Sequence, residues 1–283
     1  MKLPNIPTRR MASLAILAAL AVPLYAVDGV VLINQSAALA GNVTPGDSPG
    51  FPVTISVSGS YRLSGNLTIN DANTTAIRIA ADDVTIDLNG FSIIGPIVCS
   101  GGPPVTSCSP TPTGSAAGIF SDKSNSTVFN GTIRGMPDGI LLFGEHSRAE
   151  RIHAIGNVNS GITAQSSSNS SSVVSCAAGN NLHDGIVVNG LAIGSTANGN
   201  GGRGIFTNTG GAAINNIANF NKRDGIVGVS ATISGNAASE NGGTGITGGC
   251  PSALVSNTAF GNSGGDIFTS GSGCTRASNA PQP

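Results

Sequence analysis

Four charged residues in the second half of the chain have types and spacing that could support chemistry: His183, Asp184, Arg203 and Asp224. Asp184, Arg203 and Asp224 each directly precede a glycine, at intervals of 19 and 21 residues. If residues one interval apart are neighbours on adjacent strands, Arg203 lies about 4.8 Å from each aspartate. The aspartates would then be about 9.6 Å apart, near the upper limit for an inverting glycosidase. Because Arg203 would fill the place of the sugar, the pattern favours a surface Asp-Arg-Asp ladder, with His183 and Arg223 beside it.

Other groups of reactive residues are weaker candidates. Glu145, His146 and Arg148 lie together in a segment that the sequence predicts to be a solvated turn. A calcium site needs clustered carboxylates, and a structural zinc site needs closely spaced cysteines and histidines. The acidic residues are scattered and the chain has no CxxC motif. We therefore predict no metal and no cofactor.

The composition narrows the classes of ligand. Thirteen basic and fourteen acidic residues give a net charge of −1, so no overall field would recruit nucleic acid or a polyanionic pectin. The chain has no Trp and two Tyr, so aromatic platforms for sugars are scarce. The phenylalanines of the second and third thirds are predicted to stack in the interior; they are Phe120, Phe129, Phe143, Phe206, Phe220, Phe260 and Phe268.

The charged residues belong to a repeat that must position them. A Gly-Ile step returns about every 21 residues, and from the third return the unit reads Ala-x-x-Asn-x-x-x-Gly-Ile, with Asp266 replacing the last Gly. The isoleucines are Ile119, Ile140, Ile162, Ile186, Ile205, Ile226, Ile246 and Ile267. The asparagines are Asn157, Asn181, Asn200, Asn221, Asn241 and Asn262. A fixed period of this length is typical of a solenoid.

The repeat predicts an all-β protein, a right-handed single-stranded parallel β-helix of about ten coils. A period of 21 residues is too short for two helices and a turn, and the short β-branched runs between turn residues favour strands. Equivalent residues would stack on successive coils, with the isoleucines inside. Each buried Ile would contribute roughly 1.5–3 kcal/mol. The asparagines are predicted at a corner, where Asn tolerates a left-handed conformation and the amides can bond along the column.

The order of segments predicts an exported protein. Residues 1–26 have the basic start and apolar run of a signal peptide, and Arg9-Arg10 leaves general secretion and twin-arginine export both open. Residues 27–75 are predicted as an N-terminal cap, with a hairpin over 53–69. Residues 76–274 form the β-helix with a loop insertion at 96–114, and residues 275–283 a disordered tail. No second apolar span follows, so no membrane span is expected in the mature chain, which would be periplasmic, extracellular or at the cell surface.

Cysteine usage agrees with export. Cys99 and Cys108 bracket the Gly/Pro-rich insertion, and Cys250 and Cys274 bracket the last coil. Both pairs are predicted to form disulfides, Cys99–Cys108 and Cys250–Cys274. Cys176 remains, and its apolar neighbours predict a buried free thiol.

The chain resembles a known family. The segments 59–67 (GSYRLSGNL) and 83–91 (DVTIDLNGF), followed by the Asn-x-x-x-Gly-Ile coils, are similar to exported bacterial right-handed parallel β-helix repeat proteins, which share the pectin-lyase-like fold of pectate lyases and polygalacturonases. The resemblance implies the fold and brings no catalytic residue with it. Of the polygalacturonase motifs, Asp82-Asp83 and Arg151-Ile152-His153 match only in outline, and a Gly-His-Gly is missing.

These observations predict a non-catalytic exported β-helix that binds or displays toward a polysaccharide or a protein of the cell envelope. The alternative is a polysaccharide lyase or glycoside hydrolase with a non-standard site, near the 96–114 loop or at Asp184 and Asp224. A third hypothesis is a structural filament component. The expected partner is a glycan or an envelope protein, not nucleic acid, and the oligomeric state stays open.

Overall fold

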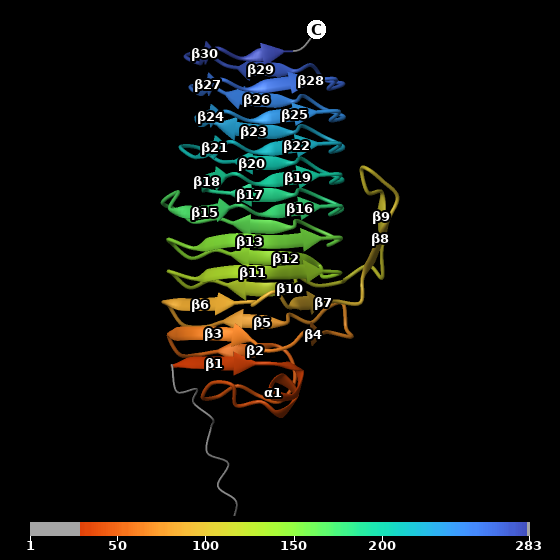
Figure 1. The fold of residues 1–283 in the computed structure, drawn as a ribbon, viewed down its shortest axis with the longest axis vertical. Coiled ribbons are helices and arrows are strands. Elements are labelled where there is room, and N and C mark those ends of the chain that lie inside the picture. Colours follow the sequence, from red (N-terminus) through yellow and green to blue (C-terminus); the bar gives the residue numbers. More distant parts are fainter. Residues whose placement is uncertain (1–28, 282–283) are drawn as a thin grey trace, which may run out of the picture.

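The computed structural model describes residues 29–281 and confirms the predicted parallel β-helix, with about eleven stacked turns. Figure 1 shows the coils stacked along the long axis, with the short helix α1 (Gln35–Ala40) below the first coils. The predicted signal peptide, residues 1–26, lies outside the described residues.

Two long parallel sheets run the length of the stack. The ten-stranded sheet consists of β2 (Val53–Ile55), β5 (Ile77–Ile79), β10 (Ala117–Ser121), β12 (Asp138–Leu142), β14 (Ile162–Ala164), β17 (Ile186–Val188), β20 (Ile205–Thr207), β23 (Ile226–Val229), β26 (Ile246–Gly249) and β29 (Ile267–Ser270). Each of these strands pairs in parallel with the strand one coil away.

The nineteen-stranded sheet is bent, because most coils contribute two short strands to it. Its strands are β1 (Val30–Ile33), β3 (Gly59–Leu63), β4 (Leu67–Thr68), β6 (Val84–Asp87), β7 (Ser92–Ile94), β11 (Thr127–Arg134), β13 (Arg148–Ile155), β15 (Ser171–Val174), β16 (Ala177–Gly179), β18 (Gly190–Ile193), β19 (Thr196–Asn198), β21 (Ala212–Ile214), β22 (Ile217–Asn219), β24 (Thr232–Ser234), β25 (Ala237–Ser239), β27 (Ala253–Val255), β28 (Thr258–Phe260), β30 (Thr275–Ala277) and β31 (Ala280–Pro281). A separate antiparallel pair, β8 (Val98–Ser100) and β9 (Ser107–Ser109), forms an arm outside the stack.

The interior is a set of columns. Ile186 pairs with Ile162 on one side and with Ile205 on the other, and all three are fully buried. Alanines such as Ala197 fill a neighbouring column where the coil is narrow. Because each side chain packs mainly on its equivalents in adjacent coils, the stability of one coil depends on its neighbours.

The predicted asparagine column is a continuous buried ladder. The side-chain Oδ1 of Asn221 accepts hydrogen bonds from the backbone N–H and the Nδ2 of Asn200, at 3.0 and 2.9 Å. Its own Nδ2 donates to Asn241 Oδ1 and to the carbonyl of Ala197, both at 2.9 Å. The left-handed conformation predicted for the asparagines is instead adopted by the residue before them, such as Asn180 (φ 53) or Phe220 (φ 57).

A second asparagine ladder, which the sequence reading missed, lies at the bend between the paired short strands. Its members bond one another in the same way; they are Asn216, Asn236, Asn257 and Asn279. Ser195 precedes them in the column, since its backbone N–H donates to Asn216 Oδ1 at 2.9 Å. Cys176 stands one coil earlier and donates its backbone N–H to the Ser195 hydroxyl.

The glycine of the Gly-Ile step is required by close packing at the corner. A Cβ atom on Gly225 would lie 2.6 Å from the carbonyl oxygen of Gly245 and 2.7 Å from Nδ2 of Asn241. No side chain fits between the ladder and the next coil, so the asparagine and the glycine are parts of one corner.

The two ends differ from the predictions. The hairpin over 53–69 is wrong: β2 pairs with β5 in one sheet and β3 with β6 in the other, both in parallel. The chain turns a corner after β2 instead of reversing. Residues 275–281, predicted as part of a disordered tail, continue the sheet as β30 and β31, because Asn279 extends the second ladder.

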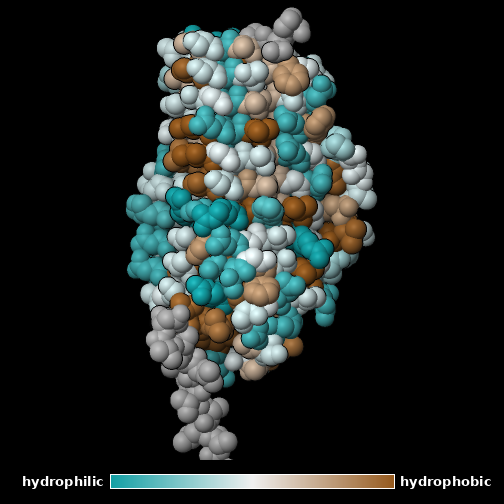
Figure 2. All heavy atoms as spheres, in the orientation of Figure 1, coloured by the Kyte–Doolittle hydropathy of each residue, from teal (hydrophilic) through white to brown (hydrophobic). Residues whose placement is uncertain are grey.

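The phenylalanines also differ from the prediction. Phe143, Phe220, Phe260 and Phe268 are exposed rather than stacked inside, because they occupy outward positions and the interior columns have room for small or branched residues. In Figure 2 hydrophobic residues of the visible face lie in small groups among hydrophilic ones.

We predict that Asn221→Ala lowers the free energy of unfolding by about 2–4 kcal/mol, because it leaves buried donors of Asn200 and the carbonyl of Ala197 without partners. Urea titration followed by circular dichroism measures the effect. Asn208→Ala is the control, since within residues 29–281 the side chain of Asn208 bonds only the adjacent backbone N–H of Thr209. Equal losses in the two variants would contradict a stabilising ladder.

We predict that Cys176 is chemically inert in the folded protein. Burial raises the pKa of its thiol to about 11, so almost no thiolate exists at pH 8. A thiol reagent such as Ellman's should label no cysteine before unfolding and one afterwards, because the other four cysteines form disulfides. Rapid labelling of the native protein is the contrary result.

Candidate functional site

Three of the four predicted charged residues, His183, Asp184 and Arg203, meet at the corner that follows the first asparagine ladder, while Asp224 stands one coil further on and does not line the same hollow. The turn between β19 and β20 carries Gly201, Gly202 and Arg203, and the equivalent turns one coil away carry the other lining residues. Together they surround an open hollow of about 480 Å³, within the range of small-ligand sites. Its lining consists of Leu182, His183, Asp184, Gly201, Gly202, Arg203, Lys222 and Arg223.

The hollow exists because two side chains are missing from the middle coil. Leu182-His183 lies on one side of Gly201-Gly202 and Lys222-Arg223 on the other, at the same place in the repeat. A Cβ atom on Gly202 would lie 2.7 Å from the carbonyl carbon of His183 and would also contact the carboxylate of Asp184. The coils approach so closely here that glycine is required, and the floor of the hollow is backbone.

The carboxylates of the predicted pair are both held by the stacking of the coils. Asp184 Oδ1 accepts the backbone N–H of Arg203 at 2.7 Å, and Oδ2 pairs with Nη2 of Arg203 at 2.7 Å. Asp224 Oδ1 accepts the backbone N–H of Thr244 at 2.8 Å. The predicted Asp-Arg-Asp ladder is therefore wrong in its second half: among the described residues Arg203 pairs with Asp184 and not with Asp224.

Arg203 is oriented on two sides. Its guanidinium carbon lies 4.1 Å from the centre of the Phe206 ring, which is close enough for a cation–π contact. The pair with Asp184 fixes one edge of the guanidinium, while its side chain stays about a third exposed (32%). The group is thus held in place, and part of it remains accessible to a ligand.

The hollow carries uncompensated positive charge. Lys222 and Arg223 are exposed, and neither forms an ion pair within residues 29–281. Together with Arg203 they place three cations around one hollow. The lining has a single carboxylate, Asp184, which is paired with Arg203. The sequence signal for this was the doublet Lys222-Arg223 directly after a ladder asparagine, but the hollow itself could not be seen without the turn geometry.

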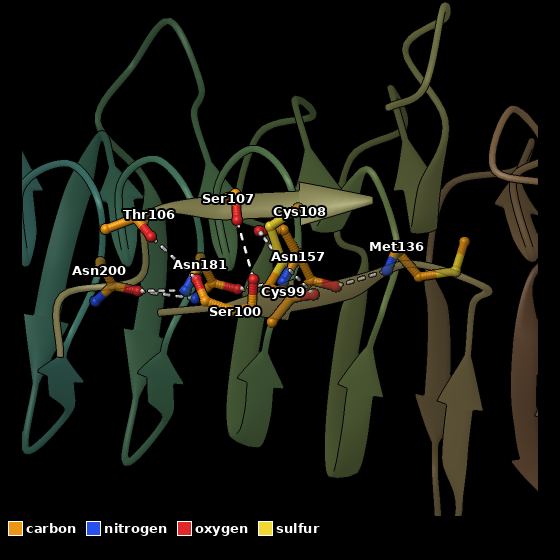
Figure 3. The surroundings of a disulfide bond; sticks show 10 residues. Cys99, Ser100, Thr106, Ser107, Cys108, Met136, Asn157, Asn181 and Asn200 are labelled. Carbon is orange, nitrogen blue, oxygen red and sulfur yellow. Dashed lines mark hydrogen bonds between the residues drawn. A yellow bond between two sulfur atoms is a disulfide. The ribbon is translucent and has the colours of Figure 1, made fainter. Parts of the chain in front are cut away.

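The disulfide arm forms a wall next to this corner. The predicted disulfides are both present, and Cys99–Cys108 links the arm strands β8 and β9. Figure 3 shows the arm lying along the column of ladder asparagines, over Asn157 and Asn181. At its tip Val105 donates its backbone N–H to the carbonyl of Gly199 at 2.9 Å and is buried. The insertion 96–114 is therefore packed against the coils beside the hollow.

The group around Glu145, which the sequence also singled out, lies apart from the hollow. Glu145 accepts hydrogen bonds from the hydroxyls of Ser167, Ser168 and Ser170, which lower the pKa of its carboxyl to about 2. This arrangement ties a serine-rich loop to the stack. Within residues 29–281 no cluster of three or more His, Cys, Asp or Glu side chains has the arrangement of a metal site.

Comparisons with known proteins agree with the fold. No protein-family model and no curated protein matches the chain. Among solved structures it is similar to the A-module of mannuronan C-5 epimerase AlgE4 of Azotobacter vinelandii, with 14% identity and a TM-score of 0.58, covering 85% of this chain and 70% of the module. The A-module of mannuronan C-5 epimerase AlgE6 of the same organism gives 14% and 0.54, covering 74% and 60%.

Likeness at this level of identity defines the class of fold, a parallel β-helix, and the activity has to be argued from the site. In the part of the chain that the structure describes, no helix has the length and apolarity needed to cross a bilayer.

Asp138 occupies the position equivalent to Asp184 in an earlier coil, and we predict that it makes stability depend on pH. Burial raises the pKa of its carboxyl above the ordinary 3.8, although hydrogen bonds from Asn159 and Ser160 oppose the shift. Because the pKa of Asp138 is higher in the folded than in the unfolded chain, its carboxyl contributes fully to the free energy of unfolding below pH 3.8. This contribution is lost as the pH rises through the pKa of the folded protein.

The free energy of unfolding of wild type relative to Asp138→Asn should therefore fall between pH 4 and pH 7. Urea titrations of both proteins at several pH values measure this difference. A difference that stays constant with pH would show that the Asp138 carboxyl has the same pKa in the folded and unfolded chains.

Proposed function

We propose that this protein is an exported β-helix that binds an acidic polysaccharide of the cell envelope or surroundings through the corner hollow. The observation that carries the proposal is the convergence of Arg203, Lys222 and Arg223 on one open hollow with a glycine floor. The two disulfides support export, because such bonds persist in oxidising compartments.

The chemistry of the hollow favours a sugar carboxylate. Arg203 presents a planar guanidinium stacked on Phe206, a geometry suited to a carboxylate. Lys222 and Arg223 add flexible cations at the rim, and the exposed ring of His183 adds a further polar group. The net charge of −1 predicted no overall field for a polyanionic pectin or for nucleic acid, but three cations gathered at one hollow support a uronate ligand without such a field. Nucleic acid, which needs an extended basic surface, stays a poor match.

The bonding of the aspartates favours binding over cleavage. An inverting glycosidase needs one carboxylic acid and one free carboxylate on opposite sides of the bond to be broken. Asp184 is occupied by Arg203, and Asp224 by the backbone of the next coil. A lyase or hydrolase using these residues would have to give up contacts that hold successive coils together.

We predict that the protein binds mannuronan and polygalacturonate but not neutral dextran, and that Lys222→Ala/Arg223→Ala weakens this binding by about 10–100-fold, as expected for losing two charge-assisted hydrogen bonds. Isothermal titration calorimetry at low and moderate salt measures both effects. Arg134→Ala is the matched control, because Arg134 is exposed on β11 and has no ion pair within the described residues.

Two results would overturn the proposal: equal affinity for the double variant and the wild type, or equal affinity for dextran and the uronates. The same samples test the enzymatic alternative. New reducing ends, unsaturated products or epimerised residues that disappear in Asp184→Asn would make the protein a catalyst rather than a binder.

A further inference from the structure

A second hollow lies near the N-terminal end of the stack, at the first coils of the ten-stranded sheet. It has a volume of about 350 Å³ and an open mouth. Two aromatic rings, a guanidinium and several hydroxyl and amide groups surround it: Phe51, Pro52, Asn73, Thr74, Thr75, Arg78, Ser115 and Phe120. None of these residues takes part in the corner hollow.

The second hollow repeats the main feature of the first. The guanidinium carbon of Arg78 lies 5.6 Å from the centre of the Phe120 ring, so it is another arginine placed over a phenylalanine. Arg78 is exposed and forms no ion pair among residues 29–281. The rings of Phe51 and Phe120 provide apolar surface for a sugar face, and the hydroxyls and amide can bond sugar hydroxyls.

The strand register places both arginine–phenylalanine pairs in line. Phe120 and Phe206 belong to one outward column of the ten-stranded sheet, which runs through Leu141, Thr163 and Val187. Four strand spacings separate the two rings, a distance of about 19 Å. No charged side chain stands in this column between them.

The surface between the two hollows is compatible with a bound chain. Leu141 and Thr163 point away from the core yet are only 9% and 7% exposed, because neighbouring side chains cover them from the sides. The column therefore lies at the bottom of a shallow depression. The adjacent turn column holds two acidic residues along this stretch. Asp138 is 7% exposed and bonded to Asn159 and Ser160, so it is shielded from direct contact with a ligand, and Asp184 is paired with Arg203.

We propose that the two hollows are the ends of one track, and that an extended acidic oligosaccharide lies along the outer face of β10, β12, β14, β17 and β20, parallel to the long axis. This inference rests on the proposed function. One ring of an extended 1,4-linked chain advances by a length close to one strand spacing, so about five rings reach from Arg78 to Arg203. Arg78 binds a carboxylate at one end, and the corner hollow binds one at the other.

The track predicts a dependence on ligand length. Uronate oligomers from dimer to octamer are titrated against the intact protein by calorimetry. Affinity should rise about tenfold or more between trimer and hexamer, when the ligand first spans both hollows, and should then level off. Arg78→Ala should remove this rise while leaving the affinity for the dimer unchanged.

The variants separate the two ideas. Lys222→Ala/Arg223→Ala should weaken binding of every length, and Arg134→Ala should change nothing. If no uronate of any length binds, the proposed function is wrong. If oligomers bind with affinities independent of length, or if Arg78→Ala binds the hexamer as tightly as wild type, the track is wrong while the corner site stands. Arg78→Lys, which keeps the charge, should retain most of the rise, and circular dichroism checks that each variant is folded.

Discussion

The structure depends on the stacking of equivalent polar side chains on successive coils. A parallel coil turns its corners with backbone donors and acceptors that no strand partner can satisfy, and burying them unpaired is costly. The asparagine ladders answer this need, because each amide accepts from the coil before it and donates to the coil after it, as Asn221 does between Asn200 and Asn241. The glycine and the alanine that recur beside the first ladder follow from the same tight corner.

This stacking also constrains where chemistry can occur. Three aspartates each accept a hydrogen bond on one carboxylate oxygen from a backbone N–H of the next coil; they are Asp138, Asp184 and Asp224. Their main role is therefore to hold successive coils together. Groups free to meet a ligand are those that stand beside the ladder columns with no equivalent partner above them. Lys222 and Arg223 are of this kind, and the hollow around them arises where the neighbouring coil has glycines in place of side chains. Arg78 is free for another reason, because it is exposed on β5 and has no ion pair among the described residues.

The features that repeat could be predicted from the sequence. The predictions failed where the repeat is interrupted and where it had to be decided whether a side chain points inward or outward. Ile186 and Asn200 recur with full period, so their columns and the fold followed directly. The second ladder was hidden because Cys176 and Ser195 replace asparagine in its first coils. The outward position of Phe220 was missed because Phe220 follows the three-residue strand β22 with a left-handed φ of 57, where strand alternation no longer shows which side is the core. The corner hollow depends on the absence of side chains at Gly201 and Gly202, which only the turn geometry reveals.

A rigid solenoid suits one kind of ligand better than others. Its outward residues are spaced at multiples of the strand separation, about 4.8 Å, along a straight line. Arg78 and Arg203 cannot close on a compact molecule, because the sheet between them is continuous and each arginine is stacked on its own phenylalanine. Arg78 has no ion pair among the described residues, and Arg203 keeps part of its guanidinium accessible beside its pair with Asp184. One ligand can contact both only if it is extended and carries charge at regular intervals. A linear polyuronate has that form, and binding it would require little rearrangement of the protein, which lowers the entropic cost of association.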